Sequence, residues 1–105
     1  MVSQSQFVAS KRKMSELERG IGSVGKLKIL RVLITDPHHA FTRYEIGKKV
    51  PNDPVSIRND LNALIQVDWV KRYRVQHLDK YVVNMDNDVV KHLTTFFRSV
   101  KYIQR

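Results

Sequence analysis

Apolar residues recur at intervals of three and four along most of the chain, which is the spacing of amphipathic helices. This pattern predicts helices over residues 15–21, 23–35, 42–50 and 54–67, and a last helix that begins after Asp86 or Asn87. Residues 69–75 and 81–85 are instead rich in aromatic and β-branched side chains, so they predict a β-hairpin with a polar tip at residues 76–80. The expected fold class is therefore α+β, mostly helical, with two central helices joined by a short turn.

Capping residues mark where the two central helices begin. Thr42 and Glu45 form a capping box, because the Thr42 hydroxyl can accept from the Glu45 amide while the Glu45 carboxylate reaches back. Asp53 suits an N-cap, and Pro54 suits the first helical position, where its missing N–H costs nothing. Gly47 lowers the helix propensity of residues 42–50, so we expect another helix to cross closely there. The same helix offers three apolar side chains for packing: Tyr44, Ile46 and Val50.

The composition limits the chain to one small domain and indicates an anionic partner. Among 105 residues, 19 Lys and Arg oppose 10 Asp and Glu, which gives a net charge of +9 and a pI of about 10.1. Such an excess favours DNA, RNA or an acidic membrane surface, although a basic surface can also serve solubility alone. The lack of cysteine excludes disulfides and thiolate sites. With no signal-peptide or membrane-spanning pattern, we expect a soluble cytoplasmic protein, associated with the nucleoid when it binds DNA.

Four segments carry a resemblance to a known family. They are residues 25–30 (GKLKIL), 42–50 (TRYEIGKKV), 55–64 (VSIRNDLNAL) and 69–72 (WVKR). In residue type and spacing, the stretch from 23 to 85 resembles the winged helix-turn-helix domains of prokaryotic regulators of the broad ArsR and MarR kind, particularly small archaeal members. The resemblance implies a DNA-binding domain over residues 23–85. This domain is preceded by a basic N-terminal arm or short helix (1–22) and followed by a C-terminal helix (86–105), which we interpret as a dimerisation helix.

Helix 54–67 is the expected recognition helix. If Leu61 marks the centre of its buried face, the opposite face carries small and amide side chains from Val55, Ser56, Asn59, Asn62, Ala63 and Gln66. Such a surface fits a major groove, since Asn and Gln can pair with an adenine edge, and a flanking Arg58 can reach guanine or a phosphate. The alternative is that these are ordinary solvated residues. The resemblance implies base contacts from Ser56, Arg58, Asn59 and Asn62.

Cations on the hairpin and on helix 42–50 are expected to contact the DNA backbone or the minor groove, contacts that set register rather than read sequence. The predicted residues are Arg43, Lys48, Lys49, Lys71, Arg72, Arg74, His77 and Lys80, and Lys11, Arg12 and Lys13 are further candidates. Trp69 is interpreted as a core residue, and Tyr73 and Tyr81 as core rather than contact residues. Asp60 departs from this pattern, because an anion on a recognition helix repels phosphates unless a cation such as Arg58 neutralises it.

The last helix carries more large apolar residues than one small core is expected to cover. Burial of such a side chain is worth about 1.5–3 kcal/mol, so an exposed stripe would drive association. We therefore expect a homodimer with two recognition helices about one DNA turn apart. The alternative is that this helix packs against its own domain. The predicted interface consists of Val89, Leu93, Phe96, Phe97, Val100 and Ile103, with Met14, Leu17 and Ile21 as further candidates.

The sequence contains no convincing motif for nucleotide binding, metal binding or catalysis. Residues 20–26 match GxGxxG and most of a P-loop, but no strand precedes them, and Leu27 stands where a magnesium-binding hydroxyl is needed. The four histidines are scattered without metal-ligand spacing. We therefore expect neither an enzyme nor a protein with a cofactor, metal or small-molecule ligand. Three hypotheses remain: a sequence-specific transcriptional regulator that binds duplex DNA, an architectural and largely non-specific DNA coater, and, third, a winged-helix module that binds protein.

Overall fold

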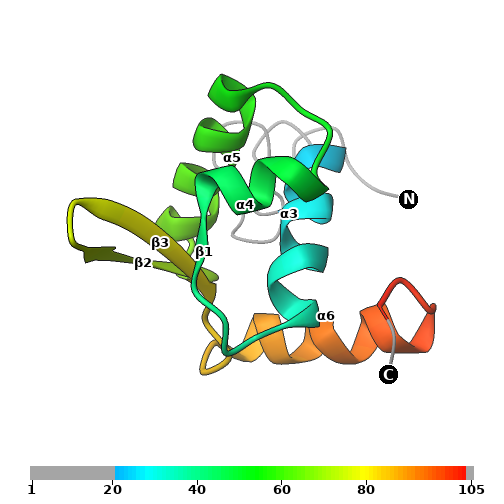
Figure 1. Ribbon diagram of the computed structural model, residues 1–105. Helices are drawn as coiled ribbons and strands as arrows, with labels where there is room; N and C mark the ends of the chain where they lie inside the picture. Colours follow the sequence, from blue (N-terminus) through cyan, green and yellow to red (C-terminus); the bar gives the residue numbers. More distant parts are fainter. Residues whose placement is uncertain (1–20, 104–105) are drawn as a thin grey trace, which may run out of the picture.

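The computed structural model describes residues 21–103. Its helices are α3 (Val24–Thr35), α4 (Arg43–Lys49), α5 (Pro54–Gln66) and α6 (Asp88–Ser99), and its strands are β1 (Phe41–Thr42), β2 (Val70–Val75) and β3 (Leu78–Val83). Figure 1 shows α4 and α5 at one end of the molecule, α6 at the opposite end and the β2–β3 hairpin projecting to one side. The arm or short helix predicted over residues 1–22 lies outside the described residues except for its last two positions. The basic cluster at 11–13 and the candidate interface residues Met14 and Leu17 are therefore not described.

Side-chain caps explain where the helices begin. Ser23, Asp53 and Asn87 each accept hydrogen bonds from backbone N–H groups in the first turn of their helix. In α4, the backbone N–H of Thr42 donates to Oε1 of Glu45 at 2.8 Å, and the N–H of Glu45 donates to Oγ1 of Thr42 at 3.1 Å. The predicted capping box is therefore confirmed, and the two central helices begin where their sequences indicate.

A single apolar core joins the helices to the base of the hairpin. Its largest fully buried side chains are Trp69, Ile29, Leu30, Leu33, Ile46, Leu61, Leu64, Val50, Val70 and Val90. Trp69 and Tyr81 are buried as predicted, whereas Tyr73 is half exposed. The buried Asn84 closes the base of the hairpin, because its Nδ2 donates to the backbone oxygen of Asp68 at 2.8 Å. This core holds α5 with only one face covered, which leaves its other face for contacts.

The sheet differs from the predicted two-stranded hairpin in two ways. β1 adds a third antiparallel strand, in the order β1-β3-β2, which the sequence does not reveal because two residues are too few to show alternation. The tip is also shorter than predicted. Only Gln76 and His77 join the strands, and their positive φ values of 50° and 70° are those of a type I′ turn. Residues 78–80 therefore belong to β3, and Lys80 lies on a strand rather than at the tip.

The chain folds back on itself after α6. The helix ends at Ser99, Lys101 adopts a positive φ of 62°, and the backbone N–H of Tyr102 donates to the oxygen of Phe97 at 2.7 Å. This reversal carries Ile103 into the core, where only 6% of it is exposed. Helical periodicity up to residue 103 therefore predicts a longer helix than the one that forms.

Half of the predicted dimer stripe is occupied by the core of the same chain. Leu93, Phe97 and Ile103 are buried in the same core cluster as the apolar residues of the other helices, and Val89 is partly buried. Phe96 and Val100 remain 57% and 54% exposed. The surface open to a second copy is therefore narrower than the six-residue stripe that the sequence predicts, because α6 also serves as the lid of its own domain.

Candidate nucleic-acid interface

The outward face of α5 carries the residue types expected to contact DNA bases, and we call it the reading surface. Ile57, Leu61 and Leu64 point into the core, so the helix turns its opposite side to solvent. On that side Arg58, Asn59, Asn62 and Gln66 are exposed, and Val55 is 55% exposed. The geometry assumed for the predicted base contacts is thus present for Arg58, Asn59 and Asn62.

Ser56, the fourth predicted base contact, is engaged in capping α5. Its backbone N–H donates to Oδ1 of Asp53 at 2.7 Å, and its hydroxyl donates to Oδ2 of the same carboxylate at 3.0 Å. The Ser56 hydroxyl can therefore accept from a base but has its proton already committed. The backbone N–H of Ser56 also lowers the pKa of Asp53 below its ordinary value, so an anion occupies the start of this helix. Phosphate contacts are left to the cations of α4 and the hairpin.

Asp60 does not lie on the reading surface. Its carboxylate is half-buried and lies against the start of α3, where a Cβ on Gly25 would meet Oδ2 of Asp60 at 2.5 Å and Nδ2 of Asn52 at 3.0 Å. Desolvation by burial raises the pKa of Asp60, and the charge of Lys26 opposes that rise. Because of this position, Asp60 should repel phosphates less than the sequence suggests. Neutralisation by Arg58 is not required.

The hairpin presents its cations on an edge strand. In β2, Lys71, Arg72 and Arg74 are all exposed, and β2 forms the outer edge of the sheet. Nε of Arg74 forms an ion pair with Oδ1 of Asp79 at 3.2 Å, whereas Lys71 and Arg72 form no ion pair within residues 21–103. His77 is exposed in the tip turn. Lys71 and Arg72 are thus the hairpin cations most available to phosphates.

Two grooves flank α4, and its candidate lysines line them differently. A groove of about 440 Å³ lies between α4 and α5 and is lined by Arg43, Tyr44, Gly47, Lys48, Asn52, Pro54 and Ile57. Tyr44 is 73% exposed rather than packed as predicted. Its ring centroid lies 5.0 Å from Nζ of Lys48, which is within cation–π range. An aromatic residue one turn before a lysine is the sequence signal that would have indicated this pair.

The predicted close crossing at Gly47 is wrong. A Cβ built there would have Ile57 Cδ1 as its nearest neighbour, at 3.9 Å, which is ordinary van der Waals contact. The tight approach is found instead at Gly25, where the Asp60 carboxylate fills the space that a side chain would need. Packing within the protein therefore explains the glycine in α3 but not the glycine in α4.

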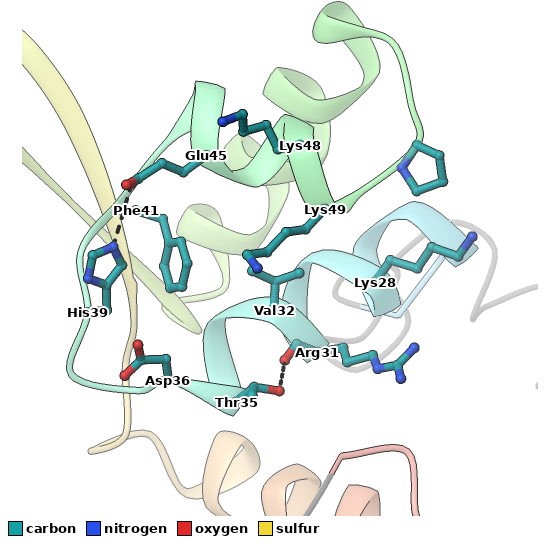
Figure 2. Close-up of a pocket in the computed structure, with 11 residues that line it drawn as sticks. Lys28, Arg31, Val32, Thr35, Asp36, His39, Phe41, Glu45, Lys48 and Lys49 are labelled. Atoms are coloured by element: carbon teal, nitrogen blue, oxygen red, sulfur yellow. Dashed lines mark hydrogen bonds and ion pairs between the residues drawn. The ribbon is translucent and has the colours of Figure 1, made fainter.

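The second groove, of about 920 Å³, lies between α3 and α4 (Figure 2). Lys28 and Arg31 line it from α3, and Lys49 extends across it from α4 toward Val32, whereas Lys48 lines both grooves. At its edge, Nε2 of His39 lies 3.5 Å from Oε1 of Glu45. The backbone N–H of Thr42 is the main reason why the pKa of Glu45 lies below its ordinary value. Lys48 therefore shares a groove with Arg43, and Lys49 does not.

Within residues 21–103, no three His, Asp or Glu side chains gather in a way that could hold a metal ion. In the same part of the chain, no helix is both long and apolar enough to cross a membrane.

Comparison with known proteins gives structural neighbours only. No family model matches the chain, and no curated protein matches it. Among solved structures, HlyU from Vibrio cholerae N16961 is 13% identical with a TM-score of 0.69, covering 97% of this chain and 100% of HlyU. The transcriptional repressor BigR from Xylella fastidiosa is 11% identical with a TM-score of 0.68, covering 94% of this chain and 96% of BigR. The homodimeric winged helix-turn-helix DNA-binding domain Mb0332 from Mycobacterium bovis, a possible ArsR-family transcriptional regulator, is 13% identical with a TM-score of 0.64, covering 98% and 95%.

At such low identity the likeness establishes the fold. The chain has a winged helix-turn-helix fold, as the sequence predicts, with four helices and a three-stranded antiparallel sheet in the described residues.

Proposed function

We propose that this protein is a transcriptional regulator that binds duplex DNA in a sequence-specific manner as a homodimer. In this proposal α5 enters the major groove, where Arg58, Asn59 and Asn62 contact base edges. The hairpin follows the backbone or the adjacent minor groove through Lys71 and Arg72. The net charge of +9 supplies the attraction to DNA that does not depend on sequence.

One observation carries the proposal: the same small domain presents an exposed helix face of amide side chains and a hairpin with exposed cations that form no ion pair with another described residue. The amides of Asn59 and Asn62 are exposed, and the one carboxylate within the turns of α5, Asp60, lies against Gly25 instead. The net positive charge suits a non-specific coater equally well, and an anion on the recognition helix mildly argues for weak base readout. The inward position of Asp60 removes this second argument.

The test is selection of bound duplexes from a random DNA pool, followed by titrations of the selected and a scrambled duplex at several salt concentrations. The double variant Arg58→Ala with Asn59→Ala is expected to bring the two affinities together. Lys71→Ala is expected to weaken both equally and to flatten the salt slope by about 0.9, the value for one lost phosphate contact. Lys91→Ala is the matched control, because it also removes one positive charge but from α6, where Lys91 faces Asp88 at 3.9 Å.

Each other outcome of this experiment contradicts the proposal. Selection that returns no preferred sequence, with one affinity for all duplexes, identifies an architectural coater. No binding to any duplex at low salt identifies a protein-binding module. Equal salt slopes for Lys71→Ala and Lys91→Ala would show that net charge alone, and not the hairpin, holds the DNA.

The proposed dimer uses the part of α6 that its own core leaves uncovered. Phe96 and Val100 lie one helical turn apart and are both more than half exposed, and the partly buried Val89 continues the same stripe toward the start of the helix. Burial of such side chains is worth about 1.5–3 kcal/mol each. That Mb0332 is homodimeric supports this assignment by analogy of fold.

Sedimentation of the full chain tests the dimer. Phe96→Asp with Val100→Asp is expected to give a monomer that binds a palindromic site weakly. Thr95→Asp adds a charge at an exposed position of the same helix that lies about 100° around the axis from Phe96 and farther from Val100, and it should leave the dimer intact. A wild-type protein that sediments as a monomer at micromolar concentration, or a double variant that still dimerises, contradicts this interface.

A further inference from the structure

The groove between α4 and α5 has the composition of a binding site and no role in packing. Its volume is about 440 Å³, within the range of small-molecule sites. Ile57 at its base is buried with 3% exposure, while Arg43, Tyr44 and Lys48 around it are all exposed. An apolar base with cations at its margin suits a ligand that has an apolar ring and a negative charge.

Tyr44 is the unexplained residue of this groove. At 73%, it has the highest exposure among the large hydrophobic side chains of the described part of the chain. Tyr44 is not among the buried or partly buried residues of the core described within residues 21–103, and its ring centroid lies 5.0 Å from Nζ of Lys48. Tyrosine at such a position is typical of interfaces, because its ring covers an apolar surface and its hydroxyl stays hydrated.

Gly47 adds an independent observation. A glycine inside a helix is unfavourable compared with alanine, yet within residues 21–103, apart from its chain neighbours and its own helix backbone, the nearest atom to the place where its Cβ would lie is Ile57 Cδ1, at 3.9 Å. The missing side chain therefore serves no internal contact. Its effect is to keep the groove open beside Tyr44.

We propose that this groove holds one sugar–phosphate unit of the duplex backbone. The ring of Tyr44 and the apolar base would cover the deoxyribose, while Arg43 and Lys48 hold the phosphate. The duplex is the occupant that fits, because the groove includes Pro54 at the first turn of α5 and is thus continuous with the proposed reading surface. The carboxylate of Asp53 already occupies the N-terminus of that helix, which leaves the α4 cations to bind the phosphate. This inference rests on the proposed function and assigns Tyr44 and Gly47 as DNA-contacting positions.

Four variants test it by titration of a labelled duplex selected from the random pool and of a scrambled duplex. Tyr44→Ala is expected to lower affinity about fivefold or more, as loss of one well-packed interface contact does, and equally for both duplexes, since a backbone contact carries no sequence information. Gly47→Leu fills the groove with a strong helix former and is expected to lower affinity similarly without unfolding the chain. Gly47→Ala fills it less and should weaken binding less. Lys48→Ala should flatten the salt slope by about 0.9.

The outcomes separate this inference from the proposed function. If the wild type binds its selected duplex and both Tyr44→Ala and Gly47→Leu bind as tightly, the groove is not a backbone site, and the proposed function stands. If Tyr44→Ala instead alters the preferred sequence, Tyr44 contacts a base, and the proposal is overturned. A deoxynucleoside monophosphate that binds the wild type but not Tyr44→Ala, with duplex affinity unchanged, would identify a free nucleotide as the ligand and overturn it equally. Thermal unfolding of each variant confirms that it is folded.

Discussion

The substitution Gly47→Ala is expected to stabilise the protein while it weakens DNA binding. In the interior of a helix, glycine is less favourable than alanine by about 0.8–1 kcal/mol. At Gly47 nothing offsets this difference, because the residue is exposed and a methyl group there would meet only Ile57 Cδ1, at 3.9 Å. Gly47→Ala should therefore stabilise the protein by close to 1 kcal/mol. For a domain of this size, such a gain raises Tm by roughly 4–8 °C.

Gly25 is the internal comparison for this measurement. It also lies inside a helix, but its Cβ would stand 2.5 Å from Oδ2 of Asp60 and 3.0 Å from Nδ2 of Asn52. Both atoms are the ends of polar side chains that can move aside, so the clash should cost less than core overpacking, which costs about 1–3 kcal/mol, and Gly25→Ala should raise Tm less than Gly47→Ala does. The double variant with Asp60→Ala should recover most of this difference, which a double-mutant cycle measures. Thermal and urea unfolding followed by circular dichroism suffices for all variants. A lower Tm for Gly47→Ala, or equal shifts for the two glycines, would refute the reasoning.

Three further predictions concern the described polar groups. The pKa of Glu45 lies below its ordinary value of 4.5, mainly because of the Thr42 N–H, so its stabilising effect is present above that pH and is lost as the pH falls through the lower folded value. Glu45→Gln should therefore be less stable than the wild type at neutral pH, and urea unfolding across an acid pH series should show that the difference disappears. Asn84→Ala should cost about 0.5–1.5 kcal/mol, because the backbone oxygen of Asp68 loses its donor at 2.8 Å but keeps Nδ2 of Asn87 at 3.3 Å; an unchanged urea midpoint contradicts this. Asp79→Asn should change stability by less than about 1 kcal/mol. It should tighten binding to any duplex and steepen the dependence of affinity on salt, because it frees Arg74 from its ion pair. Equal salt slopes for the variant and the wild type would show that Arg74 does not contact phosphates.

Local rules in the sequence were sufficient for most of the fold. Each predicted helix in the described part begins beside a residue whose side chain accepts from the first turn, such as Ser23 or Asp53, so short-range chemistry alone locates the starts. Burial of Leu61 also follows from periodicity, and with it the exposure of Asn59 and Asn62. These features depend on neighbours within one helical turn, which a single sequence contains in full.

The features that the sequence did not reveal all depend on which distant residues meet. Gly47 and Gly25 interrupt helices alike, and only the contact with Asp60 shows that one of them is required for packing. Leu93 and Phe96 belong to the same apolar stripe, yet one enters the core and the other faces solvent. The turn after α6 that buries Ile103 has no marker such as glycine, since Lys101 takes the left-handed conformation itself. Periodicity identifies an apolar face but not the element that covers it.

The division of charge within the domain has a consequence for how affinity and specificity respond to mutation. On α5, the side chains offered to bases are mainly neutral amides, and the carboxylate of Asp60 lies against Gly25, so this helix adds little attraction that is independent of sequence. Exposed cations lie on the hairpin, such as Lys71 and Arg72, and on α4, such as Arg43. Changes on the hairpin should therefore scale the affinity for all duplexes by one factor, whereas changes at Asn59 or Asn62 should alter the ratio between duplexes and leave the salt slope in place. A hairpin variant that changed this ratio, or an amide variant that changed the slope, would mean that the two tasks are shared between the elements and that the proposed orientation of α5 in the groove is wrong.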